Sequence, residues 1–281
     1  MPTFATPEPI SLVLDVAVGD IQLTATDRDD TVVDVSPSNP ANETDVRVAE
    51  QTTVERTADG VLVRGPKQRN FSLFGKTGAV DVTIELPTNS RVQVKIGAGG
   101  FRCLGQIGEC RVKAGVGDVQ LEHTGTLDVD TGAGSVDVQQ VSGDAEVNTG
   151  SGKIRVHRID GKAVLKNSNG DNWIDAVTGA IRATTANGDV TVNHAGADVS
   201  AKSANGDVRV GDIIRGTASL NTAIGQIEIG IHAGTAARLD VSTAFGKVRN
   251  QMDTVDGPAS TDETADVHAN TSFGDIVIRR A

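Results

Sequence analysis

A glycine that recurs about every eighteen residues constrains this chain more than any other feature. Successive spacings are 17, 18, 18, 18, 18, 19, 21 and 28 residues, and the glycines are Gly117, Gly134, Gly152, Gly170, Gly188, Gly206, Gly225, Gly246 and Gly274. A second glycine series, from Gly108 to Gly234, falls between them, so the chain is expected to turn about every nine residues. Such half-repeats have room for a short strand and a turn but are too short for a helix of ordinary length.

Apolar side chains alternate with polar ones after each of these glycines. Of the 18 positions that lie two and four residues after a glycine, 16 are Val, Ile or Leu, and the exceptions are Asn172 and Asn250. This alternation predicts strands with one buried face. A small polar residue lies three positions before most of the glycines, for example Thr185 and Ser203. We expect these residues to stack as a ladder that bonds to the turn backbone.

These patterns predict an all-β fold, a β-solenoid of about 18 residues per coil with two main strands per coil. One coil cannot bury its own apolar face, and stacking the coils buries it. Right-handed winding is expected from the handedness of parallel crossovers. Residues 1–95 are interpreted as an irregular β N-terminal cap that continues into solenoid repeats at 96–281, with an insertion at about 250–265, in effectively one domain. Phe71, Phe74 and Phe101 are expected to fill the cap.

Two segments resemble a known family. The unit Gly188-Asp189-Val190-Thr191-Val192, with its Thr or Ser three residues before the glycine, is similar to the repeat of the bacterial "putative adhesin" family, a domain of unknown function. The stretch from Ile84 to Val94 is similar as well, so the resemblance covers nearly the whole chain. It implies a β-solenoid, and it brings no catalytic motif, although the family's label implies exposure at a surface.

Composition narrows the classes of partner. The net charge of −11, from 26 Lys and Arg against 37 Asp and Glu, argues against nucleic acid and anionic membranes. No apolar run is long enough for a membrane span. The first residues, Met1 to Pro7, lack a basic and an apolar region, which predicts a cytoplasmic location, with a surface location only by a non-classical route. We expect the partner to be a protein or a carbohydrate, whose identity the sequence does not give.

The oligomeric state is expected to be a monomer or a weak homo-oligomer. A self-assembling oligomer or filament is the alternative function, because the open coil ends of a solenoid can stack. The chain ends in a strand, Asp275 to Arg280, whose charges should blunt pairing at such an edge.

The sequence contains no catalytic motif. The five histidines are scattered without metal spacing, and no nucleophile motif is present. Cys110 falls at an inward position and Cys103 has an ambiguous one, so neither indicates a redox role. The prediction is a non-catalytic structural or interaction scaffold without a cofactor.

Aspartates follow several of the turn glycines and raise the question of metal binding. Asp171, Asp189 and Asp207 would stack in successive coils, as in calcium-binding β-rolls, and are the metal candidates. The other interpretation is that each carboxylate caps its own turn.

Trp173 is the odd residue of the repeat. It occupies an outward position while Asn172 takes an inward one, and a one-residue bulge could exchange them and bury the indole. If no bulge exists, Trp173 is a candidate ligand or partner contact, as in a carbohydrate- or protein-binding module, together with Arg155, His157, Asp175 and Thr191.

Overall fold

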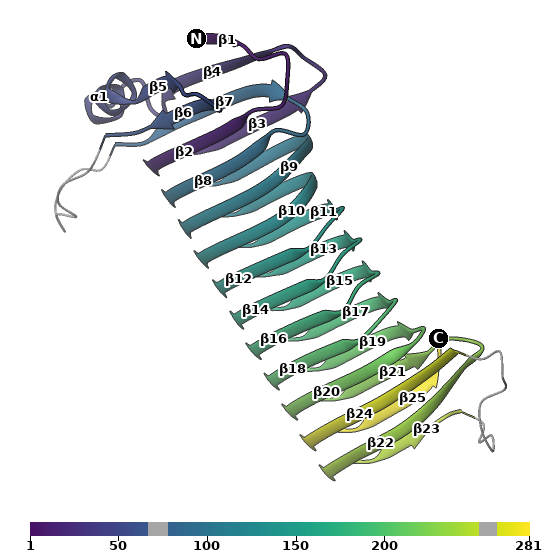
Figure 1. Cartoon of the computed structure of the whole chain (residues 1–281). Helices are drawn as coiled ribbons and strands as arrows, with labels where there is room; N and C mark the ends of the chain where they lie inside the picture. The colour runs from purple at the N-terminus through teal and green to yellow at the C-terminus, as the bar shows by residue number, and fades with distance from the viewer. Residues whose placement is uncertain (67–77, 253–262) are drawn as a thin grey trace. The chain divides into compact units, whose positions relative to one another are not determined.

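The computed structural model describes residues 1–66, 78–252 and 263–281, which form two compact units, Met1–Asp137 and Val138–Ala281. Both units consist of stacked β-coils, so the predicted all-β solenoid is confirmed (Figure 1). Phe71, Phe74 and most of the expected insertion lie outside the described residues. No helix among those residues is long and apolar enough to cross a membrane.

The described residues of the first unit form ten complete strands and one helix. Its elements are β1 Thr3–Ala5, β2 Ser11–Val18, β3 Ile21–Thr26, β4 Asp30–Pro37, α1 Glu43–Gln51, β5 Thr53–Arg56, β6 Gly60–Arg64, β7 Val80–Pro87, β8 Arg91–Ala98, β9 Phe101–Val116 and β10 Val119–Ala133, and β11 Val136–Val141 leads into the second unit. Its first coil, β2–β3, lies inside the stack, because β2 pairs in parallel with β6 and β8, and β3 with β7 and β9.

Antiparallel strands flank the outer coil of this unit. Strand β4 pairs with β7 and with β1, and β5 pairs with β6. These pairings agree with the predicted irregular β cap, and the predicted burial of Phe101 is confirmed, with 1% of its surface exposed.

Helix α1 was not expected from the repeat. The side chain of Asn42 caps it by accepting a hydrogen bond from the Thr44 amide at 3.0 Å. Asp45 in its first turn is buried and accepts a hydrogen bond from the Ala79 amide, also at 3.0 Å. This carboxylate therefore links the helix to the chain that enters β7.

The second unit has two parallel walls. One wall contains β12 Ala145–Ser151, β14 Ala163–Asn169, β16 Ile181–Asn187, β18 Val199–Asn205, β20 Gly216–Ile224, β22 Thr235–Phe245 and β24 Glu263–Phe273, and the other contains β13 Ile154–Ile159, β15 Asn172–Val177, β17 Val190–Ala195, β19 Val208–Ile213, β21 Ile227–Ile231, β23 Val248–Asn250 and β25 Ile276–Arg280. Val190 pairs with Val208 in the next coil, so the predicted repeat of 18 residues is also the structural one. Ala163, Ala183 and Ala201 are buried, which keeps the two walls close.

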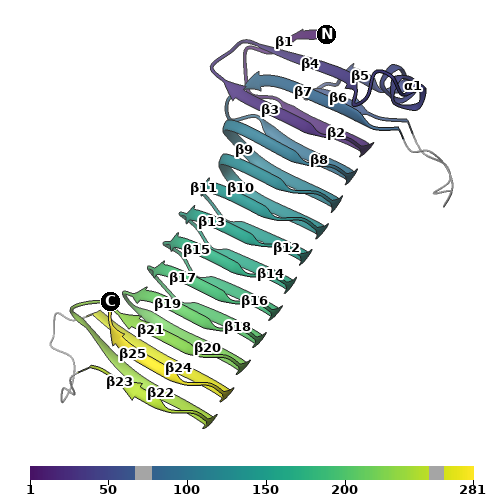
Figure 2. The ribbon, with the colours of Figure 1, turned by 180° about the vertical axis from the view of Figure 1, so that it is seen from behind.

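The last coil in sequence is not the last coil in the stack. Strand β24 pairs with both β20 and β22, and β25 pairs with both β21 and β23 (Figures 1 and 2). The earlier coil β22–β23 therefore lies outermost. The expectation that the charged residues of Asp275 to Arg280 form the end of the stack is wrong, because β25 has a neighbour on each side.

The small polar residues form the predicted ladder. Most of them bond to the carbonyl of a turn glycine in the neighbouring coil, as Thr185 does with Gly170 at 3.1 Å and Ser203 with Gly188 at 2.9 Å, whereas Thr131 bonds to the Ala133 carbonyl at 3.4 Å. Gly188 itself has a φ of +139°, and a Cβ there would collide with the Gly170 carbonyl. The tight stacking of the turns thus explains both residue preferences.

Candidate functional site

Three neighbouring strands place the predicted contact residues side by side on the outer face. In the register of β13, β15 and β17, Trp173 pairs with Arg155 on one side and with Thr191 on the other. The register continues without a shift through Asn172, which pairs with Ile154 and Val190 and is fully buried. The suggested bulge is therefore wrong, and Trp173 points outward.

The indole of Trp173 is half-buried among polar neighbours. The Arg155 guanidinium carbon lies 5.7 Å from the ring centroid, within the range of a cation–π contact. The His157 ring meets the indole edge to face, with centroids 5.1 Å apart and planes at 73°. Both contacts come from β13, so the indole is held in place from the side of the preceding coil.

A shallow hollow of about 190 Å³ opens beside this indole. Its outer wall is formed by Arg155, Trp173 and Thr191, and its turn side by Lys153, Asp171 and Asp189. Lys153 and Asp171 form an ion pair at 3.4 Å. The hollow thus combines one aromatic ring with hydrogen-bonding groups of both charges.

Two of the predicted contact residues do not line the hollow. His157 contacts the indole but lies outside the lining, and Asp175 accepts a hydrogen bond from the Asn193 amide group at 2.8 Å. Asp175 is thus engaged with the next coil, along the strand from the hollow. The structure brings Arg155, Trp173 and Thr191 together at the hollow and leaves Asp175 apart from it.

The turn aspartates bond to backbone in the neighbouring coil. Oδ1 of Asp171 accepts from the amide of Asp189 at 3.1 Å, and Oδ1 of Asp189 accepts from the amide of Asp207 at 2.8 Å. Asp207 continues the series with the amide of Gln226 at 2.7 Å. These bonds link successive coils, so the interpretation that each carboxylate caps its own turn is wrong.

The metal interpretation gains no support from this arrangement. In the parts of the chain that the structure describes, no three His, Cys, Asp or Glu side chains converge as metal ligands would. Asp144 and Asp198, at the opposite turns, make the same link to the amides of Lys162 and Thr217, both at 2.8 Å. The glycine repeat does not indicate this second set, because only Asp144 follows a glycine.

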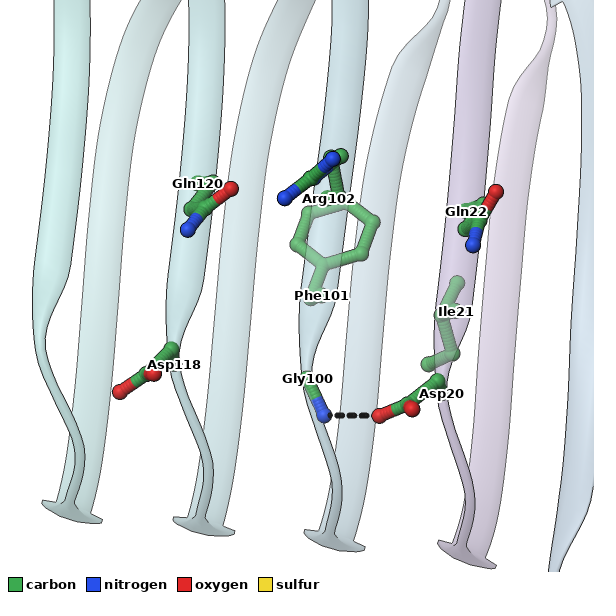
Figure 3. A pocket seen from close by; sticks show the side chains of 8 residues that line it. All are labelled: Asp20, Ile21, Gln22, Gly100, Phe101, Arg102, Asp118 and Gln120. Carbon is green, nitrogen blue, oxygen red and sulfur yellow. Dashed lines mark hydrogen bonds between the residues drawn. The ribbon is translucent and has the colours of Figure 1, made fainter.

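The first unit contains a second hollow, of about 270 Å³, with the same local construction. Gln22, Arg102 and Gln120 stand in a row on β3, β9 and β10, and Asp20 and Asp118 lie at the turn (Figure 3). The Gly100 amide donates to Oδ1 of Asp20 at 2.7 Å. The repeat alone did not single out this hollow, because it has no unusual residue such as a tryptophan.

The two cysteines are buried and poorly suited to chemistry. Burial, with a smaller contribution from Glu122, raises the pKa of Cys103 to about 12. Burial also raises the pKa of Cys110 well above its ordinary value. Since the thiolate is the reactive form, neither side chain is an activated nucleophile. Cys110 lies inward as predicted, and Cys103 does too.

The repeat and its ladders agree with the comparison to protein families. Residues 10–279 match the family described as Toastrack DUF4097, so the chain belongs to that family. The resemblance to a family of unknown function with Gly-Asp-Val repeats is thereby confirmed. A search of the curated proteins finds no match.

Two solved structures are similar to the chain over nearly its whole length. One is a "putative adhesin" from Bacteroides fragilis NCTC 9343, with 12% identity, coverage of 99% of this chain and 95% of that chain, and a TM-score of 0.35. The other is a "putative cell adhesion protein" from Clostridium sporogenes ATCC 15579, with 13% identity, coverage of 100% and 98%, and a TM-score of 0.25.

Proposed function

We propose that this chain is a non-catalytic interaction scaffold that binds a carbohydrate at the Trp173 hollow. The observation that carries the proposal is the outward-facing indole, held by Arg155 and His157 beside a hollow with polar walls. Aromatic rings with a few fixed hydrogen-bonding groups are suited to ligands that have both apolar and hydroxyl-bearing faces. Sugars have such faces.

The absence of catalysis is part of the proposal. The turn carboxylates that could act as acids or bases instead accept backbone hydrogen bonds between coils, as Asp171 and Asp189 do. The thiols of Cys103 and Cys110 are buried in the neutral form. These groups are committed to the stack, which leaves the outer wall for binding.

The charges of the hollow favour an uncharged sugar. Lys153 and Asp171 already pair, and Arg155 and Asp189 add one charge of each sign. A ligand with a strong charge of either sign would meet repulsion from half of the lining. Neutral hexose units can instead use both donors and acceptors.

The composition of the chain makes this proposal easy to test. Trp173 is the only tryptophan and the chain contains no tyrosine, so intrinsic fluorescence reports on this site alone. A panel of neutral oligosaccharides would be titrated against the protein while the emission of Trp173 is recorded. We expect a saturable change with at least one of them.

Two variants separate specific binding from general effects. Arg155→Ala removes the side chain over the indole and should weaken the binding at least about tenfold, as expected when a central contact is truncated. Arg209→Ala changes the equivalent outward position of a later coil, next to Glu228, and should bind as the parent does. Absence of any saturable response, or equal loss in both variants, would contradict the proposal. A response only to a protein partner would replace the carbohydrate with a protein ligand.

A further inference from the structure

In the described part of the second unit, β22–β23 is the outermost coil, and no strand pairs with its outer edge. Among the described residues, β22 pairs only with β24 and β23 only with β25. Val248 occupies an inward position next to the buried Ile276, yet 43% of its surface is exposed. Leu239 and Val241 also face inward and are only half-buried. Figure 2 shows this coil at one end of the second unit. Its edge therefore presents unpaired backbone, and its half-exposed inward side chains leave the apolar interior partly uncovered.

The direction of the free backbone groups follows from one hydrogen bond. The carbonyl of Phe245 accepts from the amide of Gly274, the residue that directly follows β24, at 3.0 Å. Because the amide and carbonyl of one residue point to the same side of a strand and successive residues alternate, the odd-numbered residues of β22 bond to β24. The even-numbered residues, including Arg238 and Asp240, direct theirs to the free edge.

This edge is complementary to itself when two copies meet in opposite directions. Antiparallel pairing about Leu239 places Arg238 of each copy opposite Asp240 of the other, and Ala236 opposite Ser242. Each of these pairs joins residues with free backbone groups, as a hydrogen-bonded antiparallel pair requires. Pairing about residue 238 or 240 would instead set Arg238 or Asp240 against its own copy, and like charges directly opposite each other are unfavourable.

The same register also covers the apolar interior. Leu239 meets Leu239 of the second copy as a pair without backbone bonds, and Ala237 meets Val241. Apolar groups that one copy leaves partly in water would be buried by the other.

We propose that β22 is a two-fold symmetric docking edge at which a second copy of this chain pairs antiparallel about Leu239. Such a contact is isologous, and it closes after two copies. This proposal concerns a different part of the second unit from the Trp173 hollow and does not depend on the ligand proposed there.

Charge exchange at the edge tests the proposed register. Arg238→Glu would set Glu against Asp240, and Asp240→Arg, which also loses its 3.4 Å contact with His268, would set Arg against Arg238. Each variant alone should raise the dissociation constant of the dimer at least about tenfold, through two repulsive pairs. Mixed in equal amounts, the two variants should form a heterodimer, because both cross-strand pairs then have opposite charges.

Sedimentation equilibrium with circular dichroism as the folding check provides the readout. We expect a parent dimer, two weakened single variants, a restored mixture and an unchanged Lys202→Glu control, since Lys202 lies on the internal strand β18. In addition, Leu239→Cys should form an intermolecular disulfide on oxidation, because directly opposed residues of this kind have Cα atoms about 4.5 Å apart. A monomeric parent, single variants that dimerise as the parent does, or a mixture that stays monomeric would overturn the proposal.

Discussion

Replacing the buried Asn172 by valine should make the protein more stable. Asn172 lies in an inward row between Ile154 and Val190, which are both fully buried. Its Nδ2 donates to the Thr184 carbonyl at 3.3 Å, but its Oδ1 has no partner among the described residues. The side chain thus carries a desolvated acceptor into a row that is otherwise aliphatic.

The expected gain follows from three contributions. Removal of a buried acceptor without a partner is worth about 1–3 kcal/mol, and loss of the long hydrogen bond costs about 0.5–1.5 kcal/mol. Burial of valine methyl groups adds about 1 kcal/mol. The net gain for Asn172→Val is therefore about 2 kcal/mol in the free energy of unfolding. For a chain of this size that raises the melting temperature by about 4 °C.

A matched variant should change stability in the opposite direction. Thr185 is also buried, but its hydroxyl donates to the Gly170 carbonyl at 3.1 Å, so the isosteric Thr185→Val loses about 1 kcal/mol. Calorimetry and urea denaturation of the parent and both variants would measure the two effects. If Asn172→Val melts at or below the parent's temperature, Oδ1 of Asn172 has a partner and the reasoning is refuted.

Two further predictions concern the cysteines and the turn aspartates. Because burial raises the pKa of Cys103 from 9.0 to about 12, the folded chain keeps a proton that the unfolded chain releases, so stability should fall as pH rises from 9 towards 12. Urea unfolding over this range should show a shallower fall for the Cys103→Ala, Cys110→Ala double variant, and an unchanged slope would contradict this cause. Asp189→Ala should cost about 1–2 kcal/mol through loss of the bond to Asp207, whereas Asp189→Asn keeps an acceptor and most of the stability. Calcium should leave the melting temperatures of the parent and of both Asp189 variants unaltered. A calcium-dependent rise in the parent's melting temperature that Asp189→Asn abolishes would restore the metal interpretation.

The periodicity of the sequence was sufficient to predict the register of the coils. The inward positions, the polar ladder at residues such as Thr185 and Ser203, and the turn glycines all occupy the places that the spacing indicates. Each of these features is local to one coil and its neighbour, so a repeat in sequence translates directly into a repeat in space. Helix α1 could not be found in this way, although Asn42 and the acidic first turn after it are the signals of a helix start.

The candidate site was only partly predictable. The sequence identified Trp173 as unusual and predicted its neighbours on the wall. In the structure the indole contacts Arg155 and His157, and Asp175 lies outside the hollow. The sequence did not decide between a bulge and a regular strand, because that choice depends on whether Asn172 or Trp173 costs less to bury. The structure buries the asparagine, since the larger indole has no room between closely spaced walls. The hollow itself is formed by side chains on three neighbouring strands and on the turns beside them. The periodicity of the sequence does not reveal such a hollow.

The order of the coils is the feature that periodicity cannot predict even in principle. Every coil of a β-solenoid offers nearly the same edges to its neighbours, so a coil can be inserted between two others without breaking the repeat. Thr271 shows this, because its hydroxyl bonds to the Gly225 carbonyl at 3.0 Å, while Thr243 bonds to Gly274 at 2.9 Å. Both ladder positions are satisfied, yet the later residue lies further inside the stack. Because the coil β24–β25 lies between its neighbours, β22 and not the chain's last strand is the outermost described strand of its wall. Only that placement brings Arg238 and Asp240 to a free edge.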